Sequence, residues 1–142
     1  MKSKTYYLFC KGPKLIIMAK AHAERFVTLV DDALTRVDEI DADKVKKKLD
    51  EEDDFILLDV REQDEWEASH IAGADYLGKG IIERDIEGKI HNPDQEIVLY
   101  CGGGYRSALA ADNLQKMGYK KVKSLKGGFR TWTEAGLPII KK

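Results

Sequence analysis

The chain contains few of the residues that cross-link small domains or bind metal ions. Its two cysteines, Cys10 and Cys101, are too few for a disulfide framework, and we expect Cys101 to stay reduced or exchangeable, as in a cytoplasmic setting. Its three histidines, His22, His70 and His91, are widely spaced and have no pattern of neighbouring cysteines. We therefore expect no metal site and no cofactor.

The chain also lacks an excess of charge of one sign and a long apolar run. It has 24 Lys and Arg against 25 Asp and Glu, so its composition gives no electrostatic case for nucleic-acid binding. No apolar run approaches the roughly 20 residues of a membrane-spanning helix, so we expect no membrane partner. Lys11–Lys14 interrupt the apolar residues near the start, and an export signal is not expected. We expect residues 1–20 to form a disordered or loosely attached tail, with Met18 as an alternative start.

The length of 142 residues fits one domain with an appendage. From residue 21 to residue 37, apolar residues recur at spacings of three and four, which predicts an N-terminal amphipathic helix. This helix is expected to pack on the main domain, residues 38–142, or on a second copy of the chain. A homodimer contact would suit its apolar stripe, which consists of Phe26, Leu29, Val30 and Ala33.

Short apolar runs alternate with helical patterns along the main domain. Strands are predicted at 37–40, 55–60, 97–100 and 122–125, and residues 71–77 are predicted to form a turn into a further strand. Helices are predicted at 41–49, 62–69, part of 78–91, 108–117 and 127–132. This alternation predicts an α/β fold with a mostly parallel sheet of about five strands and helices on both faces. Ligands of such sheets bind at the carboxyl ends of the strands, and Cys101 follows one of these ends.

The segment Tyr-Cys-Gly-Gly-Gly-Tyr-Arg-Ser, Tyr100–Ser107, is the strongest candidate for a functional site. Three consecutive glycines allow a tight turn in which several N–H groups can point toward the sulfur of Cys101. The start of a helix and the positive charge of Arg106 both favour negative charge there, so the segment is typical of a site for a reactive thiolate. Two other glycine-rich loops are excluded by their spacing. A dinucleotide-binding loop would need glycine at the position of Ser107, and a phosphate-binding P-loop would need lysine immediately before Ser107.

From about Asp38 to Ile140 the chain resembles the single-domain rhodaneses. The matching motifs occur in the family's order, and they are Leu58-Asp59-Val60-Arg61, Glu65-Trp66, His70-Ile71-Ala72-Gly73-Ala74, Cys101-Gly102-Gly103-Gly104-Tyr105-Arg106-Ser107 and Gly127-Gly128-Phe129-Arg130-Thr131-Trp132. One departure is Ala72, where the family usually has proline. The resemblance implies the rhodanese-like three-layer α/β fold, and it does not extend to the N-terminal helix or the tail.

The resemblance also implies a sulfurtransferase. The Cys101 thiolate would take a sulfane sulfur from a donor such as thiosulfate and pass it, as a persulfide, to cyanide or a cellular thiol. A protein is a further candidate acceptor. Arg106 would hold an anionic donor or support the loop. The expected substrate-binding residues are the rest of that loop, Gly102, Gly103, Gly104, Tyr105 and Ser107.

Three residues near the predicted site are expected to act indirectly. Asp59 and Arg61 are interpreted as a structural hydrogen-bonded pair, and His70 as a hydrogen-bonded turn residue and not a general base. Two other functions stay open at this point: a non-catalytic rhodanese-like module for binding or redox sensing, and a phosphatase or arsenate reductase. Four residues separate Cys101 from Arg106, one fewer than in cysteine phosphatases, so the loop length disfavours the latter.

Overall fold

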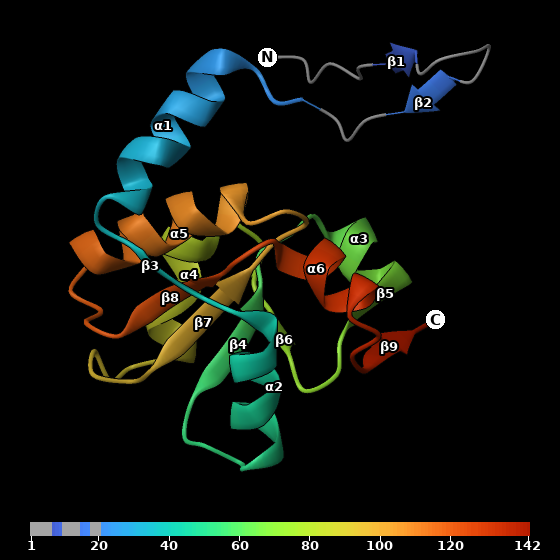
Figure 1. Cartoon of the computed structure of the whole chain (residues 1–142). Helices are drawn as coiled ribbons and strands as arrows, with labels where there is room; N and C mark the ends of the chain where they lie inside the picture. The colour runs from blue at the N-terminus through green and yellow to red at the C-terminus, as the bar shows by residue number, and fades with distance from the viewer. Residues whose placement is uncertain (1–6, 10–14, 18–20) are drawn as a thin grey trace.

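The computed structural model describes residues 7–9, 15–17 and 21–142. Its centre is a five-stranded sheet in which every neighbouring pair is parallel (Figure 1). The strand order across the sheet is β3 (Asp38–Ile40), β8 (Val122–Leu125), β7 (Ile97–Tyr100), β4 (Ile56–Asp59) and β6 (Asp75–Tyr76). The predicted α/β fold with a mostly parallel sheet is confirmed.

Helices cover both faces of this sheet. The helices are α2 (Ala42–Asp50) and α6 (Gly128–Glu134) on one face, and α4 (Ile82–Lys89) and α5 (Tyr105–Lys116) on the other. The central strand β7 is buried along its whole length, and its side chains alternate between the two cores. Ile97 and Leu99 face α4 and α5, whereas Val98 and Tyr100 face α2 and α6. A central parallel strand must be apolar on both faces for this reason.

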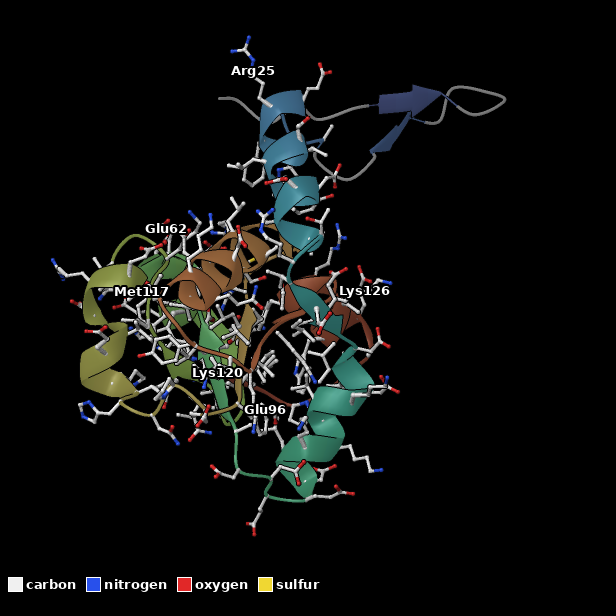
Figure 2. The ribbon with its side chains drawn as sticks, turned by 90° about the vertical axis from the view of Figure 1, so that its left-hand side faces the viewer. Arg25, Glu62, Glu96, Met117, Lys120 and Lys126 are labelled. Carbon is white, nitrogen blue, oxygen red and sulfur yellow. The ribbon has the colours of Figure 1, made fainter. Side chains whose placement is uncertain are left out.

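The N-terminal helix α1 (Glu24–Leu34) packs against α5. It is shorter than the predicted span of residues 21–37, and its C-cap residue is Thr35. Val30 and Ala33 are buried within the chain, while Leu29 is 56% exposed. The apolar stripe is therefore partly used inside this chain, and a homodimer contact would have to rest on its exposed part. The far end of α1, marked by Arg25, points away from the sheet (Figure 2).

Two pairs of short antiparallel strands were not anticipated. The strand β5 (Ser69–Ile71) pairs with β9 (Ile139–Lys141), so that the end of the chain lies beside α3 (Gln63–Ala68) (Figure 1). The turn into a strand predicted at 71–77 is present, because Gly73, with φ of 91°, lies between β5 and β6, but the strand β5 before the turn was not predicted. Each strand has two or three residues, too few to give a periodic signal.

The second pair joins β1 (Tyr7–Phe9) to β2 (Leu15–Ile17). Most of the predicted tail, residues 1–20, lies outside the described residues, and its expected looseness stays a prediction. No helix in the described part of the chain is long and apolar enough to cross a membrane.

Candidate active site

Cys101 lies directly after β7 and before α5, at the carboxyl edge of the sheet. Its thiol is free and buried, with a side chain that is 1% exposed. The backbone N–H groups of Gly104 and Ser107 donate to Sγ at 3.1 and 3.4 Å. The predicted convergence of loop amides on the sulfur is thus present for two positions of the cysteine loop, which we define as residues 101–107. Donors that converge in this way stabilise negative charge on sulfur.

Two glycines allow this loop to fold so tightly. Gly104 is the N-cap of α5 and has φ of 96°, a conformation that other residues rarely adopt. Gly128 has φ of 57°, and a Cβ there would overlap the backbone of Cys101 and Gly102. The start of α6 therefore lies directly on the loop, where the N–H groups of Phe129 and Arg130 donate to the loop carbonyls of Cys101 and Gly102 at 2.8 and 3.0 Å.

A pair of buried hydroxyls extends the hydrogen bonding of the sulfur into the protein. Ser107 Oγ lies 3.4 Å from Cys101 Sγ and 2.8 Å from Ser124 Oγ. Both serines are fully buried. The sequence analysis did not identify Ser124, a lone small polar residue in the short strand β8. Its only signal was a serine at a position where the strand should face the core.

Arg106 does not contact Cys101 directly, because it forms a two-pronged ion pair with Glu65 of α3. The two nitrogen–oxygen distances are 2.8 and 3.3 Å, and both side chains are about one-third exposed. The hydrogen bonds that Arg106 donates to Glu65 outweigh burial and raise the pKa of Arg106, and the nearby Cys101 sulfur acts in the same direction. Glu65 was identified only as part of the Glu65-Trp66 motif, so its contact with the loop was missed.

The pKa of Glu65 reflects the same pair from the other side. Burial by itself would raise this pKa, but the hydrogen bonds from Arg106 and from the backbone N–H of Glu62 hold it below the ordinary value. Glu65 also completes the capping box of α3. One carboxylate therefore fixes both the start of a helix and the arginine that closes the cysteine loop.

Asp59 and Arg61 form a buried salt bridge at the end of β4, with exposed fractions of 0% and 5%. Arg61 also donates to the carbonyl of Ser69 at 2.6 Å and lies 4.3 Å from the ring centre of Phe129. The pair thus connects β4, β5 and α6 around the site. Burial lowers the pKa of Arg61, but the hydrogen bond and charge of Asp59 outweigh it and raise the value overall.

The remaining predicted residues lie on the rim. His70 stacks on Trp66 with ring centres 3.5 Å apart, and its Nδ1 lies 3.2 Å from the carbonyl oxygen of Trp66. Tyr105 contacts the N-terminal segment, with its ring centre 4.3 Å from that of His22 and 6.0 Å from that of Phe26. The segment around α1, which lies outside the resemblance, therefore forms part of the wall beside the cysteine loop.

A cavity of about 560 Å³ opens between α1, the start of α2 and the cysteine loop. Gly103, Gly104 and Tyr105 line it from the loop, and Lys126 lines it just after the end of β8. The loop glycines thus border open space on this side. Among the described residues, no group of three or more His, Cys, Asp or Glu is arranged to hold a metal ion.

Comparison with known proteins places this site in a family. The family model described as "Rhodanese-like domain" matches residues 41–135. A sulfurtransferase of Allochromatium vinosum is 34% identical over 104 residues, which cover 73% of this chain and 95% of that protein. A Bacillus subtilis protein, provisionally named the sulfur carrier protein YrkF, is 36% identical over 97 residues; the match covers 68% of this chain and about half, 51%, of that relative's length.

A solved structure gives the same fold with a different suggestion of function. A Rhodopseudomonas palustris protein of unknown function, described as a possible tyrosine phosphatase, aligns with a TM-score of 0.74 and 30% identity, covering 87% of this chain and 99% of that one. The family match spans the sheet, the cysteine loop and the start of α6, which together build the site. The chain therefore belongs to the rhodanese-like domain family.

Proposed function

We propose that this protein transfers a sulfane sulfur from a small donor, such as thiosulfate, to a thiophilic acceptor through a persulfide on Cys101. The observation that carries the proposal is the hydrogen bonding of a buried, free Cys101 sulfur by two loop amides and one hydroxyl. Such donors support an anionic sulfur, which is the reacting form in covalent catalysis by a thiol. The Allochromatium vinosum relative supports the same reaction class.

The proposed first step begins with attack of the Cys101 thiolate on the sulfane sulfur of thiosulfate. A bond forms between Sγ and that sulfur as the sulfur–sulfur bond of thiosulfate breaks, and sulfite leaves with the bonding electron pair. In the second step a nucleophile, cyanide or a cellular thiolate, attacks the outer sulfur of the persulfide. The thiolate of Cys101 is then the leaving group, and the cycle consumes no oxidant or reductant.

The loop residues have distinct roles in this proposal. Gly104 and Ser107 hold Sγ through their amides, and the absence of side chains at Gly102 and Gly103 leaves room for an outer sulfur. Arg106, paired with Glu65, supports the loop and offers limited attraction to an anionic donor. Asp59, Arg61 and His70 are proposed to hold the surrounding elements and not to react.

Intact-protein mass spectrometry after incubation with thiosulfate tests this function. We expect a gain of about 32 Da, one sulfur atom, which cyanide or dithiothreitol removes, as covalent catalysis requires. The gain should be absent in Cys101→Ser and present in Cys10→Ser, a matched control for the other thiol. No gain with thiosulfate, a glutathione persulfide or a mercapto acid would contradict the proposal and favour a non-catalytic binding module.

The phosphatase suggested by the Rhodopseudomonas palustris relative is tested with the same preparations. We expect no hydrolysis of an aryl phosphate, because the loop between Cys101 and Arg106 is one residue shorter than in cysteine phosphatases. Hydrolysis by the wild type that is lost in Cys101→Ser would mean that the protein is a phosphatase and not a sulfurtransferase.

We further propose that the acceptor is a thiol of a reducing, cytoplasmic compartment, and that a second copy of the chain is a partner through the exposed part of α1.

A further inference from the structure

A pair of buried hydroxyls, those of Ser107 and Ser124, lies behind Cys101, and Ser107 is the member of the pair that contacts the sulfur. Ser107 belongs to the first turn of α5 and Ser124 to the middle of β8, so helix and strand each provide one hydroxyl. Both side chains are fully buried, and Ser107 Oγ lies between Ser124 Oγ and Cys101 Sγ. The three atoms form a continuous chain that ends at the reacting sulfur.

Counting the protons gives this chain a direction. Each hydroxyl has one proton to donate. If Ser124 donates to Ser107, the proton of Ser107 is free to point at Sγ, and both donors are satisfied. If the direction is reversed, Ser107 donates to Ser124, and the buried proton of Ser124 then finds no acceptor among the residues that the structure describes. A buried donor without a partner is costly, so the direction toward the sulfur is favoured.

The direction is linked to the ionisation of the cysteine. A thiolate can only accept hydrogen bonds, and it accepts the proton of Ser107 together with the amides of Gly104 and Ser107. A thiol that donated its own proton to Ser107 would leave one buried hydroxyl proton, that of Ser107 or that of Ser124, without an acceptor among the described residues. We propose that Ser124 is a positioning residue, whose hydroxyl orients Ser107 so that Ser107 donates to the Cys101 thiolate.

This inference rests on the proposed function, because it assigns Ser124 a role in the same chemistry. The thiolate is the nucleophile of the first step and the leaving group of the second, so the same hydrogen bond would support both. Within such a chain each hydrogen bond also polarises the next, which lets a residue without contact to the sulfur act on it.

The test is the pH profile of Cys101 alkylation by iodoacetamide in the full chain, followed by mass spectrometry of the peptide that contains Cys101. Alkylation needs no sulfur donor, so its outcome is independent of whether sulfur transfer occurs. At a pH below the midpoint of the profile, we expect Ser124→Ala to react about threefold more slowly, the effect of losing one neutral hydrogen bond. The midpoint should move to higher pH.

Three further variants separate orientation from general loss of structure. Ser124→Thr keeps a hydroxyl and should retain the original profile. Tyr119→Phe removes another buried hydroxyl, which lies away from the site and donates to the carbonyl of Ile90 at 2.6 Å. This variant should leave the alkylation profile unchanged. In a Ser107→Ala background, Ser124→Ala should cause no additional change, because Ser124 acts through Ser107.

Two results would overturn the inference. One is an unchanged profile for Ser124→Ala in a protein that remains folded. The other is an effect of equal size with and without Ser107, which would mean that Ser124 acts through packing alone. If persulfide formation fails while the coupling of Ser107 and Ser124 is found, the proposed sulfur transfer is wrong and the role of Ser124 stands.

Discussion

At the scale of single residues, the site separates the group that reacts from the charge that surrounds it. Cys101 is buried and is held by neutral donors, whereas the charged pair of Arg106 and Glu65 lies at its edge and is about one-third exposed. The carboxylate of Glu65 cancels most of the positive charge that Arg106 would offer to an anion. Glu65 thus fixes the arginine and weakens its attraction for anionic donors at the same time.

Replacement of Glu65 by Gln separates these two effects. The Gln side chain can still accept a hydrogen bond from Arg106, but it no longer repels a donor with negative charge. We expect the KM for thiosulfate in Glu65→Gln to fall about threefold at low salt and the difference to shrink as salt screens the charges. Steady-state kinetics with thiosulfate as the varied donor measure it.

The matched control is Glu67→Gln, which removes the same charge from an exposed residue of α3 that is bonded to Gln63. An equal fall in KM for both variants would mean that only the net charge matters.

The pH dependence of stability provides a second check on the pairing of Glu65. The pKa of Glu65 is lowered in the folded protein, so its pairing stabilises the fold above the ordinary glutamate pKa and is lost as pH falls through the lowered value. The free energies of unfolding of the wild type and of Glu65→Gln should therefore converge only below about pH 4.

At the scale of elements, the position of α6 decides the shape of the cysteine loop. Its first residues donate to the carbonyls of Cys101 and Gly102, and Gly128 leaves no space for a side chain between helix and loop. The buried pair of Asp59 and Arg61 also contacts this helix, because the guanidinium of Arg61 lies over the ring of Phe129. The loop is therefore shaped by elements on either side and not by its own glycines alone.

Gly128→Ala should disturb the loop more than its backbone conformation alone explains. Gly136 also has a positive φ, of 69°, but a Cβ there would meet open space. We expect Gly136→Ala to lower the free energy of unfolding by about 1–2 kcal/mol from strain. Gly128→Ala should add about 1–3 kcal/mol from overlap with the loop backbone and should also slow persulfide formation.

Urea unfolding and the mass gain with thiosulfate measure the two effects. Similar losses of stability in the two glycine variants, with persulfide formation intact in both, would show that α6 can retreat from the loop without consequence. Loss of the persulfide in both variants would instead point to unfolding as the cause.

Elements built from neighbouring residues follow from the sequence, whereas contacts between distant elements do not. The cysteine loop, the sheet class and most helices could be predicted, because each depends on residues that are contiguous or periodic. Glu65 and Ser124 could not be assigned to the site, because they reach it from α3 and β8, and their contacts depend on how distant elements pack. The pairing of β5 with β9 was missed for the same reason, since His70 lies opposite Ile140.

At the scale of the whole molecule, α1 is part of the folded unit although the family match begins after it. It packs on α5 through Val30 and Ala33, and Arg36, just after it, forms two hydrogen bonds with Asp112 at 2.9 and 2.8 Å. The hydrogen bond from Arg36 outweighs burial and lowers the pKa of Asp112. Apolar packing and this ion pair therefore hold α5, whose first residue is Tyr105, against the α1 segment.

Two adjacent residues of α1 test this arrangement. Val30 is 2% exposed and Leu29 is 56% exposed. Val30→Ala should lower the free energy of unfolding by roughly 1–3 kcal/mol because it removes buried apolar area. Leu29→Ala should change it by less than about 0.5 kcal/mol. Urea unfolding separates the two, and equal losses would mean that α1 is not packed as described.

Sedimentation of the same two variants tests the proposed homodimer. A contact through the exposed part of α1 predicts weaker self-association in Leu29→Ala while its stability stays unchanged. If Leu29→Ala associates as the wild type does, the contact does not involve this residue.

The strand order has a consequence for how the chain matures during synthesis. The strand β7, which leads to Cys101, lies between β4 and β8, and β3 at the edge pairs with β8, more than eighty residues later. A sheet built from such distant pairings forms late. The partners of the cysteine loop, Ser124 and Gly128, leave the ribosome after Cys101 itself. Until they arrive the cysteine loop lacks the contacts that Ser124 and Gly128 provide, so Cys101 can react in the nascent chain before the fold that controls it is complete.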